Sequence, residues 1–346
     1  MNYGLSVYLN YKDEDIYRVM EKAHKLGFEY IFTSLHIPEE SYADYKTRFE
    51  KIISYCKENS LNLIADVSPK TLKLLKIDSF DILKDMGFEY LRLDFGFDSE
   101  ELIELSRDFN LVLNASTFTD ELYEELLHKG FDFGKVICCY NYYPKKYTGI
   151  ARENVMERND YFHVRNIRTM AFVQGDRHKR GPFFEGLPTC ESQRNDDTFY
   201  NALYMQRIQG TDILVVGDFD ISDKTFNRFE NYSKGYIEVE CKILNGYEEY
   251  LGYVHHDRID HSKYFIRSYE SAYTHKTDKP VNPHKTLERH TGDICVSNRK
   301  YMRYNGELEI MLKDLPKDEK VNVIGHTDSN LLRFVDDKIG VLLKKI

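Results

Sequence analysis

A short motif recurs along the first half of the chain, in which glycine and an aromatic residue follow a helical pattern and precede an apolar run. It reads Lys25-Leu26-Gly27-Phe28-Glu29-Tyr30, then Asp85-Met86-Gly87-Phe88-Glu89-Tyr90, and more loosely Lys129-Gly130-Phe131-Asp132-Phe133. A glycine just past a helix takes the left-handed conformation that closes the last turn, and the next aromatic packs back on the helix. Gln209-Gly210-Thr211 is a fourth case. Repeated helix, glycine and strand units predict βα crossovers and a parallel sheet.

The number of strands decides between two parallel architectures. Eight segments have the apolar character of buried strands: Tyr3–Leu9, Tyr30–Leu35, Leu61–Val67, Tyr90–Phe95, Leu111–Ala115, Val136–Tyr140, Thr169–Val173 and Ile213–Val216. Amphipathic stretches such as Glu14–Leu26 and Tyr42–Asn59 separate them. Eight β/α units within about 230 residues predict a (β/α)8, or TIM, barrel. An open doubly wound sheet is the alternative, but no G-x-G-x-x-G follows the first strand.

The sequence pattern changes near Tyr236. Alternation of apolar and polar residues replaces the helical pattern in Tyr236–Leu244, Glu307–Leu312 and Lys320–Ile324, with turn signals such as Asn245-Gly246 between them. We therefore expect a TIM-barrel catalytic domain over residues 1–232 and a smaller β-rich domain over residues 233–346. The join is expected in the polar segment 222–235.

Composition excludes several classes of partner. The formal charge of −9 opposes attraction to nucleic acid or anionic membrane, and no apolar run is long enough for a membrane helix. The six cysteines have no C-x-x-C spacing, which favours free thiols in a cytoplasmic protein. No zinc spacing, phosphate loop or dinucleotide fingerprint is present, so we expect no metal and no cofactor. The sequence gives no indication of oligomeric state.

The predicted strand ends are unusually polar. In a barrel the carboxyl ends of the strands meet at one face, where catalytic groups lie. The side chains at these ends are Ser6, Tyr8, Ser34, His36, Asp66, Asp94, Asn114, Ser116, Asn141, Gln174, Asp176 and Asp218. Asp94 is the strongest candidate, because burial can raise and neighbouring charges can lower the pKa of a carboxylate that ends an apolar strand. A helix cap or an ion pair is the alternative interpretation of Asp94.

The segment Gln174–Glu191 is a long loop with three glycines and two prolines, and it follows the seventh strand. Glu185 stands between an aromatic residue and a glycine, which suits a partly dry proton donor, although a solvated loop charge is an equal alternative. The basic run of this loop, from Arg177 to Arg180, lies where barrels commonly bind phosphate. Asn141 and Tyr143, in the loop after the sixth strand, offer amide and phenol groups typical of sugar sites.

Several of these segments together resemble the bacterial 6-phospho-N-acetylmuramidase family. The segments are Gly4-Leu5-Ser6-Val7-Tyr8, Phe32-Thr33-Ser34-Leu35-His36-Ile37-Pro38-Glu39, Leu91-Arg92-Leu93-Asp94, Asn141-Tyr142-Tyr143-Pro144 with Thr148-Gly149, and Arg180-Gly181-Pro182 with Glu185-Gly186-Leu187-Pro188-Thr189. The resemblance runs the whole length and implies a TIM barrel followed by a cyclophilin-like domain. It implies an intracellular glycosidase of cell-wall recycling. Such an enzyme releases N-acetylmuramic acid 6-phosphate from a β-1,4-linked disaccharide with N-acetylglucosamine.

Glycoside hydrolysis usually needs two carboxyl groups, one protonated and one ionised. We expect Glu185 to be the general acid/base and Asp94 the ionised partner, although the residues also allow the reverse. Asp94 could instead orient the 2-acetamido group of the sugar for substrate-assisted attack. The expected substrate contacts are Ser6, Tyr8, His36, Asp66, Asn114, Asn141, Tyr143, Arg177, Arg180 and Glu191. A phosphosugar isomerase or aldolase and a sugar-phosphate sensor are the alternative functions.

Overall fold

The computed structural model describes residues 2–35 and 42–346, and the chain divides into two compact units, one up to Phe226 and one from Asn227. The division falls inside helix α9 (Asp223–Ser233), within the polar segment expected to form the join. The expected boundary at 232/233 lies in the same helix and stays a prediction. No helix among the described residues is long and apolar enough to cross a membrane.

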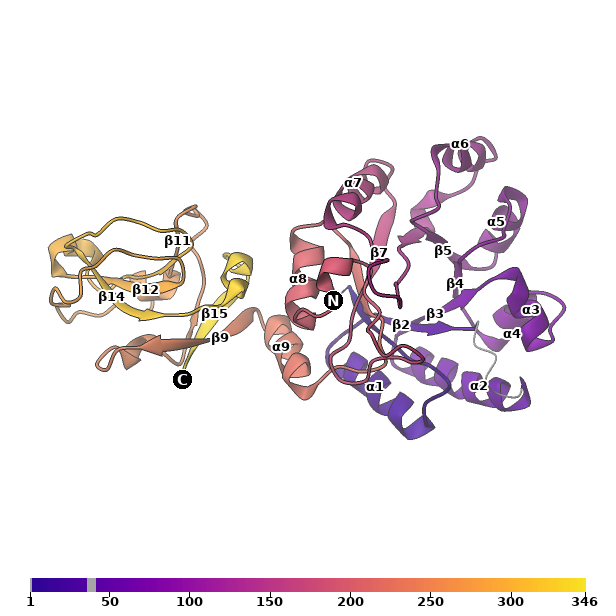
Figure 1. Cartoon of the computed structure of the whole chain (residues 1–346), viewed down its shortest axis with the longest axis horizontal. Coiled ribbons are helices and arrows are strands. Elements are labelled where there is room, and N and C mark those ends of the chain that lie inside the picture. The colour runs from indigo at the N-terminus through magenta and orange to yellow at the C-terminus, as the bar shows by residue number, and fades with distance from the viewer. Residues whose placement is uncertain (1, 36–41) are drawn as a thin grey trace. The chain divides into compact units, whose positions relative to one another are not determined.

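The first unit is a closed barrel whose strands follow one another in chain order, and β1 closes it by pairing with β8 in parallel, as the TIM-barrel prediction requires (Figure 1). The strands are β1 (Tyr3–Ser6), β2 (Tyr30–Ser34), β3 (Asn62–Val67), β4 (Tyr90–Leu93), β5 (Asn110–Asn114), β6 (Ile137–Cys139), β7 (Arg168–Val173) and β8 (Ile213–Val216). Most are shorter than the apolar runs that predicted them, because several runs continue into the loops at the carboxyl end.

Helices surround the barrel strands (Figure 1). They are α1 (Asp13–Lys25), α2 (Tyr42–Glu58), α3 (Pro69–Leu75), α4 (Asp81–Met86), α5 (Ser99–Ser106), α6 (Asp120–His128), α7 (Arg152–His163) and α8 (Thr198–Arg207). The crossover between β3 and β4 is divided between two short helices. Ser68 and Pro69 start the first of them, and Lys76 ends it in the left-handed conformation.

The glycines of the recurring motif close the helices as predicted. Gly27 and Gly87 have φ angles of +65° and +102°, in the region that favours glycine. The N–H of Phe28 donates to the carbonyl of Ala23 at 2.9 Å, and that of Phe88 donates to Leu83 at 3.0 Å. Both phenylalanine side chains are buried. Each turn therefore ends a helix and directs the chain into the next strand.

Alternate side chains of the strands fill the barrel. An apolar cluster includes Phe32, Ile64, Val112 and Cys139, which come from four different strands. Because side chains alternate along a strand, the next inward positions toward the carboxyl ends come two residues later. These positions are Ser34, Asp66, Asn114 and Asn141. The apolar core therefore forms the floor below a set of polar side chains.

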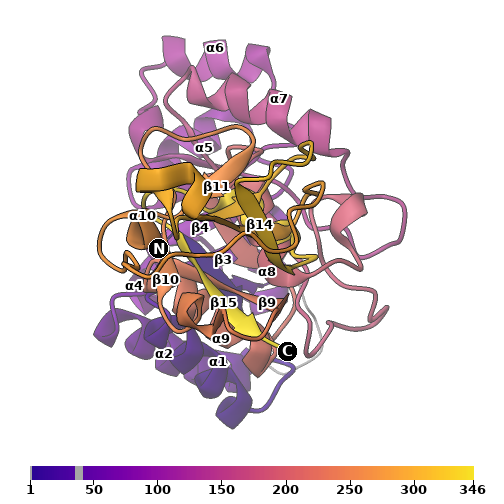
Figure 2. The same ribbon diagram turned by 90° about the vertical axis from the view of Figure 1, so that its left-hand side faces the viewer.

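The second unit is built on a seven-stranded mixed sheet in the order β10-β15-β9-β14-β12-β13-β11. Its elements are β9 (Tyr236–Ile243), β10 (Val254–His255), β11 (Phe265–Arg267), α10 (Tyr269–Ala272), β12 (Asp293–Ser297), β13 (Leu308–Met311), β14 (Val321–His326) and β15 (Gly340–Lys345). Figure 2 shows β9 and β15 side by side, and they pair in parallel although they lie at opposite ends of the unit's sequence. The three alternating segments identified in the sequence are strands β9, β13 and β14.

One carboxyl group in the second unit lacks a hydrogen-bond partner. Glu309 lies on β13, opposite Arg267 of β11 and Cys295 of β12. Its Oε2 is buried and accepts no hydrogen bond from the described residues. Burial raises the pKa of Glu309 to about 7, against the opposing effect of the Arg289 charge. A pKa raised by folding means that the ionised form destabilises the folded unit.

Replacing Glu309 with glutamine should therefore stabilise the second unit above pH 7 and have little effect near pH 4. The stability that depends on the protonated carboxyl is complete below its ordinary pKa of 4.5 and is lost as pH rises through about 7. The gain at pH 8 should be on the order of 2 kcal/mol. Calorimetric unfolding at both pH values measures it, with exposed Glu240→Gln as the control. An equal effect at both pH values would contradict this account.

Candidate active site

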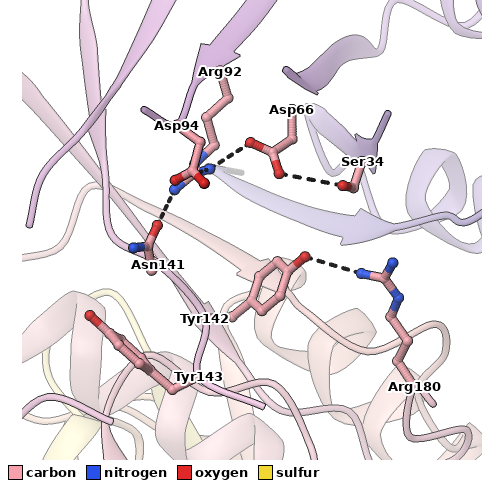
Figure 3. Close-up of a pocket in the computed structure, with 8 residues that line it drawn as sticks. All are labelled: Ser34, Asp66, Arg92, Asp94, Asn141, Tyr142, Tyr143 and Arg180. Carbon is pink, nitrogen blue, oxygen red and sulfur yellow. Dashed lines mark hydrogen bonds and ion pairs between the residues drawn. The ribbon is translucent and has the colours of Figure 1, made fainter. Parts of the chain in front are cut away.

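A cavity of about 460 Å³ lies at the carboxyl ends of the barrel strands (Figure 3). Its lining side chains come from β2, β3, β4 and the loops after β4, β6 and β7, so residues far apart in the sequence meet there. They are Ser34, Asp66, Arg92, Asp94, Asn141, Tyr142, Tyr143 and Arg180. Two carboxylates, two guanidinium groups and three hydroxyl groups therefore face one space above the apolar core.

Arg92 connects the polar groups on one side of the cavity. It lies on β4 with its side chain buried, and Nη1 is 2.5 Å from Asp66 Oδ1 and 3.3 Å from Asp94 Oδ1. Nη2 donates to the side-chain oxygen of Asn141 (Figure 3). Burial works against the charge of Arg92, but the carboxylate of Asp66 and, to a smaller extent, that of Asp94 raise its pKa above the ordinary value. The guanidinium is therefore a permanent cation that orients three side chains.

The two carboxylates differ in access. The side chain of Asp66 is 6% exposed, and its second oxygen lies 3.4 Å from the Ser34 hydroxyl. The side chain of Asp94 is 27% exposed and also accepts a hydrogen bond of 3.2 Å from Asn114 Nδ2. Asp66 thus supports Arg92 from below, whereas Asp94 presents an oriented carboxylate to the cavity.

Arg180 occupies the other side of the cavity. Its Nη1 donates to the Tyr142 hydroxyl at 3.0 Å, and its guanidinium lies 3.7 Å from the centre of the Tyr8 ring. Burial raises the pKa of Tyr142, so the phenol stays neutral. None of the described carboxylates lies within ion-pair distance of the Arg180 guanidinium, in contrast to Arg92. A cation without a carboxylate partner beside a cavity is suited to an anionic ligand.

Asp218, which follows β8, holds the loop that carries Arg180. One carboxylate oxygen accepts the N–H of Arg180 at 2.8 Å, and the other accepts the N–H groups of Gly175 and Leu187 at 2.8 and 3.1 Å. The side chain is completely buried within the first unit. Burial raises the pKa of Asp218, although the three N–H donors oppose this effect. A single carboxylate therefore fixes both ends of the loop and the middle.

The structure brings together about half of the predicted site residues. Asp66, Asp94, Asn141, Tyr143 and Arg180 line the cavity, and Asn114 contacts Asp94 from behind. His36 lies outside the described residues.

Four other predicted residues are outside the set that lines the cavity. Ser6 is buried, and the Tyr8 hydroxyl donates to the carbonyl of Gly217. Arg177 is ion-paired with Asp220 and Asp223, and Glu191 is ion-paired with Arg194.

Glu185 lies outside the set of lining residues. Its Oε2 is 2.8 Å from Lys146 Nζ, and its side chain is 36% exposed. Lys146 belongs to the loop after β6, so this ion pair joins the loops that follow β6 and β7. The expected pairing of Glu185 with Asp94 stays a prediction.

Three lining residues, Ser34, Arg92 and Tyr142, are absent from the expected catalytic and substrate-contact residues, although Ser34 was identified as a polar strand end. The two-residue period identifies two of them, since Ser34 and Arg92 follow Phe32 and Tyr90, which point inward or pack against the core. Tyr142 lies in a loop, where no such period applies. It packs edge-on against Phe32 and Phe172, which places it against the core.

Among the described residues, no group of three or more His, Cys, Asp or Glu side chains is arranged to hold a metal ion. A closed β/α barrel with a cavity of carboxylates, arginines and hydroxyls at its carboxyl face is the arrangement typical of barrel enzymes with small polar substrates.

The sequence places the chain within this class. It matches the family described as 6-phospho-N-acetylmuramidase, N-terminal, over residues 3–231 and the corresponding C-terminal family over residues 236–339. The chain therefore belongs to the 6-phospho-N-acetylmuramidase family, a family of glycosidases.

Two solved structures share the whole architecture. A conserved Enterococcus faecalis protein with an unknown function is 31% identical, with a TM-score of 0.84 over 100% of this chain and 96% of that one. An uncharacterized B. cereus protein is 23% identical, with a TM-score of 0.78 over 99% of both chains, and this likeness shows the fold alone. No curated protein matches the chain by sequence.

Proposed function

We propose that the protein hydrolyses the β-1,4 bond between N-acetylmuramic acid 6-phosphate, at the non-reducing end, and N-acetylglucosamine. The family supports a glycosidase that acts on a phosphorylated muramyl sugar. The observation that carries the proposal is the division of charge in the cavity. Arg180 has no carboxylate partner among the described residues, while Arg92 holds Asp66 and Asp94. The side of the cavity at Arg180 thus suits an anionic group of the substrate, and the side at Arg92 suits chemistry by a carboxylate.

In this proposal Asp94 acts in its ionised form. Contacts from Arg92 and Asn114 orient its carboxylate, and it is the more exposed of the two acidic groups in the cavity. It either attacks or stabilises the anomeric carbon, or it orients the 2-acetamido group of the sugar for attack from within the substrate. Asp66 is buried against Arg92 and serves as its support.

Glu185 is the proposed proton donor to the leaving oxygen. In the structure its carboxyl is ion-paired with Lys146, so the acid role requires that the carboxyl turn from Lys146 toward the sugar when substrate fills the cavity.

The proposal includes the place of the reaction. The substrate is expected from peptidoglycan recycling, and the proposed compartment is the cytoplasm, in keeping with six buried cysteines that form no disulfides. A cyclophilin-like assignment of the second unit follows from the same resemblance and concerns its fold, which by itself implies no prolyl isomerase activity.

Hydrolysis and simple binding are separated by one assay. Incubation with the 6-phosphorylated muramyl disaccharide should release N-acetylglucosamine, which is measured by chromatography. Binding without release would favour a sugar-phosphate sensor. Rearrangement of a phosphosugar monosaccharide without hydrolysis would favour an isomerase.

Replacing Arg180 with methionine should weaken the productive binding of the phosphorylated substrate. Methionine keeps an unbranched chain over Tyr8 but removes the charge-assisted contacts, worth about 1.5–3 kcal/mol. We expect kcat/KM to fall by about 10- to 100-fold, mainly through KM. Arg177→Met is the matched control, since Arg177 lies in the same loop but pairs with Asp220 and Asp223. An equal loss in the two variants would count against Arg180 as the anion contact.

A further inference from the structure

An ion pair between Arg194 and Glu191 lies at the end of the long loop that follows β7. Arg194 Nε is 2.7 Å from Glu191 Oε1, and its Nη2 is 2.6 Å from Glu191 Oε2. The Arg194 side chain is 3% exposed and that of Glu191 is 25% exposed, so the guanidinium is buried although its partner is partly open to water. The second Glu191 oxygen also accepts the N–H of Gly149 at 2.9 Å. The guanidinium of Arg194 is thereby held in one orientation.

The remaining donors of Arg194 reach two loops at the carboxyl face of the barrel. Nη1 donates to the carbonyl of Gly186 at 3.1 Å and lies 3.5 Å from that of Glu185. Nη2 donates to the carbonyl of Lys145 at 3.2 Å. These carbonyls belong to the loops after β7 and β6, and each loop carries one partner of the Glu185–Lys146 ion pair. Arg194 therefore joins the backbones of both loops directly beneath that pair.

Apolar packing does little to fix this part of the loop. Phe183 and Phe184 are 59% and 65% exposed, and Phe184 has a φ of +56°, in the left-handed region that a phenylalanine rarely adopts. Beyond Gly186 the chain is fixed again by the bond from the Leu187 N–H to Asp218. Polar contacts must therefore hold the backbone between Phe184 and Leu187. Arg194 provides such contacts at the carbonyl groups of Glu185 and Gly186.

The hydrogen bond from Arg194 outweighs desolvation and lowers the pKa of Glu191 to about 2, so Glu191 stays ionised beside the guanidinium. The pair also fixes geometry, since the planar guanidinium offers donors in fixed directions that a lysine ammonium does not match. The four protein groups around Arg194 use these directions fully. This arrangement is typical of a residue that supports the position of a functional group.

We propose that Arg194, oriented by Glu191, is a positioning residue that fixes the backbone at Glu185 so that its carboxyl meets the glycosidic oxygen. The inference rests on the proposed function, because it takes Glu185 as the proton donor. Glu191, expected from the sequence to contact the substrate, takes a supporting role instead. Arg194 is a residue that the sequence analysis did not identify.

Two substrates with different leaving groups test this inference. The sugar leaving group of the phosphorylated disaccharide needs a proton, whereas the 4-nitrophenolate of the corresponding aryl glycoside leaves without one. Arg194→Lys should lower kcat on the disaccharide by about 10- to 100-fold, part of the 10²–10⁴ that a positioned acid supplies. On the aryl glycoside the rate of the first step, followed as nitrophenolate release in a single turnover, should change by less than about threefold, because this step needs no acid.

Arg152→Lys is the matched control. Arg152 donates to Ser192 in the same turn as Glu191, without a contact to the loop that carries Glu185. It should leave the ratio of the two rates unchanged. If Arg194→Lys does not fold, Glu191→Gln, which removes the charge that orients Arg194, should show the same selective loss. The melting temperature of each variant shows whether it is folded.

Equal losses on the two substrates would overturn the positioning role, as would unchanged activity on both. Failure of the inference is separable from failure of the proposed function. If the wild type cleaves neither substrate, the proposed function is wrong. If the wild type cleaves both and Arg194→Lys has no selective effect, only the role of Arg194 is wrong.

Discussion

Replacing Glu185 with glutamine should lower kcat on the phosphorylated disaccharide by about 10²–10⁴-fold, the contribution of a general acid. Glutamine keeps the shape of the side chain but has no proton to give to the leaving oxygen. The loss should shrink to less than about tenfold in the first step of cleavage of a 4-nitrophenyl glycoside, because nitrophenolate leaves without assistance. Initial rates on the two substrates measure the difference.

Glu153→Gln provides the control for this change, since Glu153 is an exposed glutamate on helix α7. It should leave both rates unchanged. Near-normal turnover of the disaccharide by Glu185→Gln would exclude Glu185 as the acid. Among the described residues, the carboxyls that line the cavity, those of Asp66 and Asp94, would then be the next candidates for the proton donor.

Replacing Asp94 with asparagine should lower kcat by on the order of 10²–10³-fold, whichever leaving group is used. The reason is that Asp94 acts at the anomeric carbon or the acetamido group, and a better leaving group does not replace either role. Arg92 and Asn114 both contact Asp94 Oδ1, so the amide oxygen of asparagine can keep both contacts while an N–H₂ group replaces the other carboxylate oxygen. Kinetics on the disaccharide and the aryl glycoside together therefore distinguish the variants of Asp94 and Glu185.

Asp98→Asn is the control for Asp94. Asp98 follows in the same loop and caps helix α5 through the N–H of Glu101, a role that asparagine fills nearly as well. Its activity should match the wild type. Rescue of Asp94→Asn by the aryl glycoside would mean that Asp94 is the proton donor, the reverse assignment that the residues allow.

The barrel could be predicted because its signals are local. Gly27 and Gly87 close their helices within one turn, and the strands that follow them, β2 and β4, are mostly buried. The ends of the predicted strands also placed Asp66 and Asn141 at the carboxyl face of the barrel, where both line the cavity. The strand order of the second sheet was beyond reach, because β9 pairs with β15 and β14, which lie some eighty residues or more away in sequence.

Loop residues show where sequence reasoning ends. Arg177 and Arg180 are three positions apart and chemically alike, yet one pairs with Asp220 and the other lines the cavity. Glu191 likewise has the composition of a ligand contact but pairs with Arg194. Which partner a loop charge meets depends on strands and loops that come later in the chain, and no pattern within the loop records it.

The phosphate dependence of hydrolysis tests the central claim most directly. Wild-type protein is given the β-1,4-linked muramyl disaccharide with and without the 6-phosphate, and released N-acetylglucosamine is measured over time. We predict release from both, or from the phosphorylated form alone, with kcat/KM at least about tenfold higher for the phosphorylated form, the value of one charge-assisted contact. No release from the phosphorylated disaccharide, or equal rates for the two, would contradict the account.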